Sequence, residues 1–345
     1  MSMALYHNGY NPANSQEQYA VMLDMLERAE ADNVLDIAFS EVTHAKKKGR
    51  SVRFSRWAIP ATNTTPIVEG INNSVRSLTP EDVFVTIEEY SETFAYSSQA
   101  ADLDPLDYAA GVAEVGYDLV KLDRTAIRWA TMISGTQRIF NSSTISQRTG
   151  VNGVITGGRL DQAVTILRSA KAKPYSDLKL GSNRIGTTGL MPSFIAFGHE
   201  HLRPDFEKIP GWQPASQYPS DVRLNPYEVG SLASGRIRVI LSPELEPIAD
   251  AGAAKGSANL RSTSGTSVDV YPIVIVGKYA LKSLSLRGSG ARGSGNLDTY
   301  TINGPDRVDP ANLTRYWSAH WYDANFIAHE LWMIRVEVAC TAAYQ

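Results

Sequence analysis

The segment 288–295 reads GSGARGSG, and its first three spaced glycines fit the G-x-G-x-x-G pattern of a dinucleotide-binding loop. Such glycines hold a pyrophosphate only where a strand runs into a helix whose N-terminus faces the phosphates. The apolar, β-branched segment 270–287 predicts the strand. Segment 296–310 contains turn residues and no apolar residues at helical spacing, so no helix is predicted there. We therefore interpret GSGARGSG as a flexible loop, and a nucleotide-binding oxidoreductase is a distant alternative.

Two His-Glu pairs, at His199 and His329, begin like the zinc-protease motif H-E-x-x-H. The fifth position is Arg203 in one and Met333 in the other, so the second imidazole ligand is missing. The single cysteine, Cys340, lies in a strand pattern that predicts burial, and it cannot form an intrachain disulfide. The sequence thus predicts no catalytic residue, no cofactor and no metal, and we expect a protein that is not an enzyme.

The composition is that of a globular protein. The chain has 345 residues, of which 43% are hydrophobic, and its formal net charge is -3. No apolar run approaches the roughly 18 residues of a membrane-spanning helix, and the N-terminus lacks a signal-peptide pattern. We therefore expect no membrane partner and a protein that stays in the cytoplasm where it is made.

Charge is segregated along the chain. No lysine or arginine occurs from Ser77 to Val120, whereas a basic stretch lies just before this region. The charged residues that matter here are Lys46, Lys47, Lys48, Arg50, Arg53 and Arg56 in the basic stretch and Glu81, Asp82, Glu88, Glu89 and Glu92 in the acidic one. Each block alone is consistent with a solvated face, but the separation of opposite charges favours a contact with a partner of opposite sign.

The N-terminal third predicts long, thin elements. Apolar spacing from Asn14 to about Phe39 indicates an amphipathic helical arm. Alternating residues around Phe54 and from Val83 to Ile87 indicate two long strands, joined by a turn-rich excursion between Pro60 and Pro80. We expect an extended hairpin and not a core sheet.

The strongest helix signal begins at Asp104-Pro105, a helix cap followed by a proline at the first helical position. The apolar pattern runs to residue 134, so the helix of 105–134 would be about 45 Å long. We call it the spine helix. Its predicted buried face includes Val115, Leu119, Leu122 and Trp129.

The rest of the chain predicts a separate αβ body. A second helix is expected from about Arg159 to Lys173, and short strands and loops follow it. The final segment, 330–344, reads ELWMIRVEVACTAAY and has one apolar face, which indicates a strand.

The order of these parts resembles the major capsid proteins of tailed double-stranded-DNA phages and, more narrowly, the major capsid protein family of N-four-like podophages. No single segment is diagnostic, but their order and spacing together are specific. The segments that carry the resemblance are TPIVEG (65–70), the hairpin-to-spine run 90–130, SFIAFGHEHLRPDF (193–206), EVGSLASGRIRVILSPEL (228–245), VYPIVIVGKYA (270–280) and the run 308–339.

This resemblance implies an α+β fold of the Hong Kong 97-like type. The implied divisions are an N-terminal arm (1–50), an extended loop (51–101), a peripheral domain with the spine helix (102–190), an axial domain (191–315) and a C-terminal strand returning to the peripheral domain (316–345).

The resemblance also implies the function. Hexamers and pentamers of one chain would tile an icosahedral shell around double-stranded DNA, which is enclosed without sequence specificity. The shell would assemble in the host bacterial cytoplasm and end in the virion, with portal, scaffolding and decoration proteins as candidate partners. An encapsulin-type nanocompartment shares the fold and is the nearer alternative. In either shell we expect the basic stretch to contact the acidic stretch of an adjacent subunit.

Overall fold

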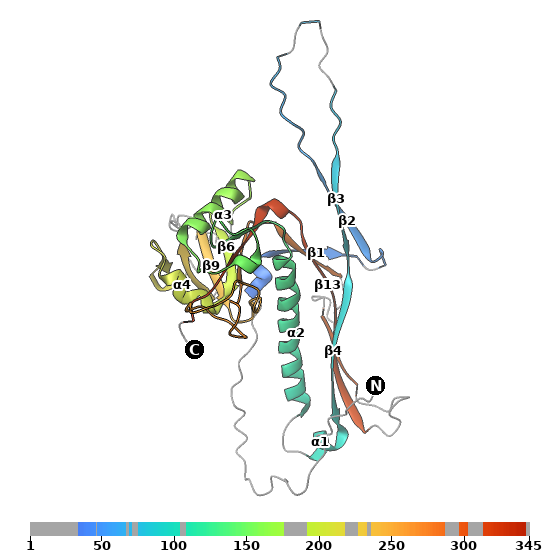
Figure 1. Ribbon diagram of the computed structural model, residues 1–345. Helices are drawn as coiled ribbons and strands as arrows, with labels where there is room; N and C mark the ends of the chain where they lie inside the picture. The colour runs from blue at the N-terminus through green and yellow to red at the C-terminus, as the bar shows by residue number, and fades with distance from the viewer. Residues whose placement is uncertain are drawn as a thin grey trace, which may run out of the picture.

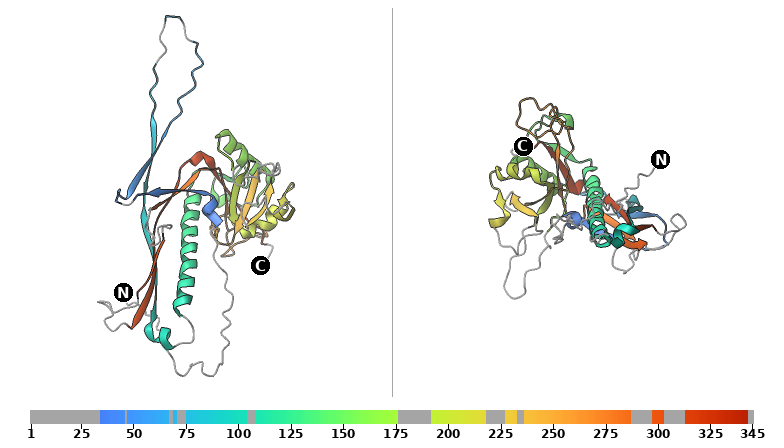
Figure 2. Two further views of the ribbon diagram at one scale, coloured as in Figure 1. Left: turned by 180° about the vertical axis from the view of Figure 1, so that it is seen from behind. Right: turned by 90° about the horizontal axis from the view of Figure 1, so that it is seen from below.

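The computed structural model has a compact body beside a long, thin flank from which a hairpin projects (Figure 1). The flank consists of one long helix and a sheet, and the helix stands between the compact body and that sheet (Figure 2). The structure describes residues 34–45, 47–66, 69–70, 75–103, 108–175, 192–217, 227–232, 236–286, 297–302 and 313–342.

The compact body is built on a seven-stranded sheet. Its order is β5 (Arg138–Phe140), β14 (Met333–Val338), β10 (Tyr271–Val276), β6 (Phe194–His199), β9 (Ile237–Ser242), β8 (Glu228–Leu232) and β7 (Gln213–Pro214). Every residue of β6, β9, β10 and β14 is buried. A strand that is buried on both faces reads as a continuous apolar run, which explains segments such as YPIVIV.

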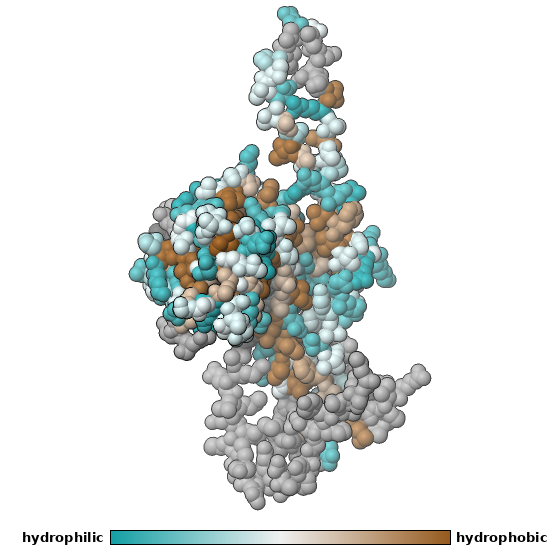
Figure 3. Space-filling model, in the orientation of Figure 1, coloured by the Kyte–Doolittle hydropathy of each residue, from teal (hydrophilic) through white to brown (hydrophobic). Residues whose placement is uncertain are grey.

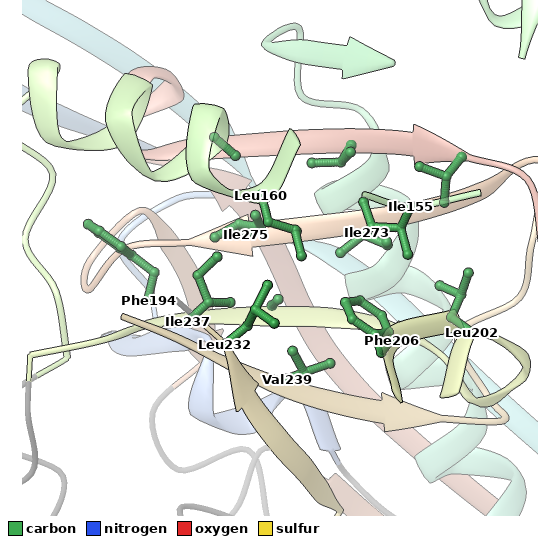
Figure 4. Packing of buried hydrophobic residues seen from close by; sticks show 14 of the residues in the cluster. Ile155, Leu160, Phe194, Leu202, Phe206, Leu232, Ile237, Val239, Ile273 and Ile275 are labelled. Atoms are coloured by element: carbon green, nitrogen blue, oxygen red, sulfur yellow. The ribbon is translucent and has the colours of Figure 1, made fainter. Parts of the chain in front are cut away.

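Helix α3 (Gly157–Ser169) covers one face of this sheet through Leu160, which belongs to the same hydrophobic cluster as Phe194, Ile273 and Ile275 (Figure 4). The opposite face carries Phe197 and its neighbours on β6, β9 and β10, and it packs against the C-terminal end of the flank helix. The sheet therefore has a hydrophobic cluster on each side.

The flank sheet has five strands. They are β1 (Phe39–His44), β11 (Leu281–Leu286), β13 (Thr314–Ile327) and β12 (Leu297–Ile302), with β4 (Glu88–Ser97) pairing along β13. The long strand β13 holds the sheet together because β4, β11 and β12 all pair with it antiparallel. Tyr90 lies opposite Trp321 and Phe94 opposite Trp317, with ring centroids 5.8 and 5.9 Å apart.

Helix α2 (Tyr108–Ile133) is the spine helix and packs on the flank sheet through Val120, which meets Trp317 and Trp321. Gly116 allows this close approach, since a Cβ there would lie 2.3 Å from the Trp317 ring. The predicted start at Asp104-Pro105 lies outside the described residues.

The predicted phase of the spine helix needs correction. Trp129 is buried, but Val115 is 44% exposed and Leu122 is 40% exposed, while Leu119 is half-buried. The sheet instead takes the neighbouring face that includes Gly116 and Val120. The prediction was wrong because the helix has two apolar faces and periodicity does not say which one meets the protein's own sheet.

The predicted hairpin is present but shorter than 51–101. Strands β2 (Ser51–Trp57) and β3 (Pro80–Thr86) pair antiparallel, with Ser51 opposite Thr86 and Trp57 opposite Pro80. The next strand, β4, belongs to the flank sheet. We use the term hairpin for residues 51–86.

Other predicted boundaries also shift. Helix α3, expected in the peripheral part, packs in the compact body, as does β14, which was expected to return to the peripheral domain. The segments β11, β12 and the start of β13, expected in the axial domain, lie in the flank sheet. The chain crosses between the compact body and the flank several times, as between β10 and β11 and between β13 and β14.

The arm is described only from Val34. The 3-10 segment η3 (Val34–Ile37) is followed by β1, so the expected helix does not extend to Phe39. Residues 1–33 lie outside the described residues, as does the loop GSGARGSG; the element described after that loop is the strand β12 and not a helix. The other short helices among the described residues are α1 (Ser98–Leu103), α4 (Arg203–Glu207), η4 (Arg148–Gly150), η5 (Glu200–Leu202), η6 (Ala215–Gln217) and η8 (Glu330–Trp332).

Candidate assembly interface

The charges of the hairpin pair across its two strands. Arg56 Nε lies 2.6 Å from Glu81, and Arg53 Nε lies 3.2 Å from Asp82. The pairing register places Arg56 directly opposite Glu81. Cross-strand pairs of opposite charge stabilise an antiparallel ribbon, although each exposed pair contributes at most about 1 kcal/mol.

Three of the six residues of the basic stretch thus pair within their own chain, and their expected contact with an adjacent subunit stays a prediction. Arg50 pairs with Glu88 at the start of β4, so all three arginines of the stretch have acidic partners in their own chain. The physical reason is that the turn-rich excursion brings the basic strand back against the acidic one. Lys47 and Lys48 are exposed, and Lys46 lies outside the described residues.

The remaining predicted acidic residues face the flank. Glu89 forms a hydrogen bond with the ring of His320 on β13. The pKa of Glu92 is raised, by burial first and then by the carboxylate of Asp123 on α2, and burial also raises the pKa of Asp123. This carboxyl pair lies between β4 and the spine helix.

Arg56 also fixes the hairpin to the end of β13. Its Nη1 donates to the carbonyl oxygen of Ala328 at 3.1 Å and faces Nδ1 of His329. Burial, and then the charge of Arg56, lowers the pKa of His329, which favours the neutral ring that accepts this hydrogen bond. Phe54 packs on Phe326 with ring centroids 4.8 Å apart. No sequence motif pointed to this anchor, because its parts are far apart in the chain.

The hairpin exposes large apolar side chains. Trp57 is 67% exposed, Ile59 92% and Val75 99%, and Leu78 and Phe84 are also exposed. Figure 3 shows brown, hydrophobic atoms along the projecting hairpin. Single exposed apolar residues are common, but a concentration of them on a two-stranded ribbon indicates a surface that a partner covers.

The residues considered for catalysis are engaged elsewhere. His199 Nδ1 accepts a hydrogen bond from the backbone N–H of His201 at 2.9 Å, and the Cys340 thiol donates to the carbonyl oxygen of His201. Burial raises the pKa of the Cys340 thiol to about 12, which opposes formation of a nucleophilic thiolate. Within the part of the chain that the structure describes, no group of three or more His, Cys, Asp and Glu side chains is placed to hold a metal.

Buried charges in the compact body form structural ion pairs. Glu337 on β14 accepts hydrogen bonds from Arg148 at 2.7 and 2.9 Å and pairs with Arg335. Burial pushes the Glu337 pKa up, but the Arg148 hydrogen bonds and the nearby positive charges lower it overall. A pocket of about 540 Å³ is lined by residues that include Glu228, whose carboxylate is paired with Arg238 at 3.2 Å.

No described helix combines the length and apolar character needed to cross a membrane. No protein-family model matches the sequence, and no curated protein matches it.

Solved structures do resemble the chain. The capsid of cyanophage P-SCSP1u matches with a TM-score of 0.57 and 11% identity over 93% of this chain and 92% of that chain. The head structure of Helicobacter pylori bacteriophage KHP40 matches with a TM-score of 0.60 and 11% identity over 99% and 100%. The capsid of Ralstonia phage GP4 matches with a TM-score of 0.62 and 10% identity over 89% and 88%.

The fold is therefore the α+β, Hong Kong 97-like fold of phage capsid proteins. The likeness extends over most of both chains, so it includes the compact body, the spine helix and the hairpin. At this identity the likeness establishes the fold, and the function has to be argued from the surfaces.

Proposed function

We propose that this protein is the major capsid protein of a tailed double-stranded-DNA phage and that it assembles as hexamers and pentamers into an icosahedral head. The observation that carries the proposal is the hairpin with its exposed Trp57, Ile59 and Val75. A two-stranded ribbon is marginal in water by itself, so these apolar residues favour burial on a neighbouring subunit. The likeness to phage capsids supports the same function.

In this proposal the protein is structural and not an enzyme, and it resides in the virion after assembly in the host cytoplasm. The shell encloses DNA without sequence-specific contacts and joins a portal, with scaffolding and decoration proteins as further candidate partners. The narrower assignment to the N-four-like podophage family rests on the sequence segments that resemble that family. No observation favours the alternative of an encapsulin-type shell over a phage capsid.

The lysines are the best candidates for charge contacts between subunits. Lys47 and Lys48 are exposed, whereas the arginines that follow them have partners in their own chain. We propose that Lys46, Lys47 and Lys48 contact acidic side chains of an adjacent subunit. Changing all three to Glu is expected to leave the subunit folded and to reduce the yield of shells, most strongly at low salt. Normal shell yields at low salt would reject this contact.

The hairpin surface provides the main test of the proposed function. The triple variant Trp57→Ser, Ile59→Ser, Leu78→Ser is expected to keep the circular dichroism and urea midpoint of the parent subunit but to form no shells in electron micrographs. These side chains are exposed in the free subunit, so their loss costs little within one chain.

A matched control changes exposed apolar residues elsewhere. Leu331 is 62% exposed and Tyr279 is 43% exposed, and neither is on the hairpin. The double variant Leu331→Ser, Tyr279→Ser is expected to assemble like the parent. Shells of parental yield from the hairpin variant would overturn the role given to the hairpin.

A further inference from the structure

The spine helix α2 has an apolar face that the described residues leave partly uncovered. Val115 and Leu122 are among the exposed large hydrophobic residues, Ala126 is exposed and Leu119 is half-buried. At 100° per residue these positions form one stripe, separate from the face that meets the flank sheet. Figure 3 shows apolar surface continuing below the compact body, where Figure 1 places α2.

The N-terminal arm enters the described structure beside this helix. Val34 and Leu35 of η3 are buried in the same cluster as Trp129 and Met132 near the C-terminal end of α2. Arg128 on α2 also pairs with Asp36. Chain connectivity therefore brings the residues before Val34 to the end of the stripe.

The arm has the pattern and the length to cover the stripe. Its apolar residues Tyr19, Met22, Leu26 and Ala29 recur at three and four residue steps, with acidic residues such as Asp24 opposite them. A helix over 14–33 would be about 30 Å long, whereas the stripe from Val115 to Ala126 covers about 17 Å.

We propose that residues 14–33 pack as an amphipathic helix along α2 of the same chain and cover Val115, Leu119 and Leu122. The two helices run in the same direction because the arm ends at the C-terminal end of α2. This alignment places Leu26 opposite Leu122 and Tyr19 opposite Val115. The contact does not depend on shell formation, since both helices belong to one subunit.

Paired cysteines test the contact in the purified chain. The pair Leu26→Cys with Leu122→Cys is expected to form an intrachain disulfide under mild oxidation, identified by mass spectrometry of the linked peptides. The control pair Asp24→Cys with Leu122→Cys places one thiol on the polar face of the arm and is expected to link about ten-fold more slowly, because the geometry of a disulfide is restrictive. Cys340 is buried and stays in both variants.

Three outcomes decide the proposal. A fast intrachain link only in the Leu26 pair supports it. Disulfide-linked dimers in place of the intrachain link would show that the arm of another copy covers the stripe and would overturn the assignment within one chain. Equal, slow linking of both pairs would overturn the contact itself, even if electron micrographs of the same preparations show shells.

The arm can also be changed without touching the described core. Leu26→Asp is expected to speed tryptic cleavage after Arg28 about ten-fold, because an unpacked arm is open to the protease for a larger fraction of the time. Glu27→Asp, on the polar side of the arm, is the matched control and should cleave at the parental rate. An unchanged cleavage rate in Leu26→Asp would contradict a packed arm.

Discussion

The compact body and the flank bury their apolar residues differently. In the body, the strands β6, β9, β10 and β14 are buried along their whole length, with a hydrophobic cluster on each face of the sheet. In the flank, α2 covers the sheet with one apolar face and exposes part of another, and the hairpin exposes Trp57 and Ile59. The body thus buries its apolar residues within itself, whereas the flank exposes apolar surfaces that other segments or subunits can cover.

The charges differ in the same way. Glu337 in the body is fully buried and pairs with both Arg148 and Arg335, so removing both arginines would leave an unpaired carboxylate in the core. The hairpin pairs, such as Arg53 with Asp82, are open to solvent. We therefore expect charge changes to affect folding strongly in the body and only weakly in the hairpin.

The largest contrast should come from the same substitution made in each part. Phe197→Ala in the body removes a fully buried ring and is expected to lower the free energy of unfolding by about 3–5 kcal/mol. Phe84→Ala in the hairpin, where the ring is 71% exposed, should change it by less than about 0.5 kcal/mol. Urea unfolding of unassembled subunits measures both, and similar losses would break the comparison.

The contact between α2 and the flank sheet should respond next most strongly. Gly116→Ala places a methyl group 2.3 Å from the Trp317 ring, so the helix or the ring must move, at a cost of up to about 3 kcal/mol. Gly111→Ala on the same helix meets no atom within 4 Å and should raise stability by up to about 1 kcal/mol through helix propensity. Thermal unfolding of the two variants compares them, and equal midpoints would refute the close approach.

Acid should weaken the body through His199. Burial, and then the charges of His201 and Arg261, lower the His199 pKa from 6.5 to about 4, while the Tyr271 ring packs nearby. Glu200 and Asp269 also face this cluster, through His201. The stabilisation is complete above pH 6.5 and is lost as the pH falls towards 4, since only the unfolded state takes up the proton readily.

The expected loss across this interval is about 1–3 kcal/mol, where the lower value allows for screening by solvent. Urea midpoints measured from neutral to acidic pH give the slope. His199→Gln should flatten it, although carboxylates elsewhere will contribute their own acid dependence. An identical slope in the parent and in His199→Gln would exclude His199 as the source.

The smallest effect should come from the hairpin ion pairs. Arg53→Ala removes the pair with Asp82 and is expected to change the free energy of unfolding by less than about 1 kcal/mol, because both side chains are exposed to solvent. High salt should remove the difference between variant and parent. A larger loss that persists in high salt would mean that the hairpin is part of the folded core.

Local patterns predicted the elements well. The alternation around Phe54 and Val83 gave the hairpin, and the long apolar periodicity gave α2. The pattern did not predict which face of α2 packs on the flank sheet. Leu122 and Val120 are both apolar, and only tertiary packing distinguishes their faces. Gly116, isolated in an apolar helix, was the one local signal of a close approach to the sheet.

The pairing of residues far apart in the chain could not be predicted from the sequence. The positive and negative blocks were visible, but their register, such as Arg56 opposite Glu81, depends on where the hairpin turns. The sequence also did not show that the successive strands β13 and β14 enter different sheets. The anchor of Arg56 at Ala328 and His329 joins residues that no spacing rule relates.

Electron cryo-microscopy of the purified chain tests the central claim most directly. The account predicts closed shells with hexameric and pentameric units in which each hairpin lies on a neighbouring subunit and its Trp57 is buried. Monodisperse particles of the 37.7 kDa subunit under all assembly conditions, or shells whose hairpins project free into solvent, would contradict it.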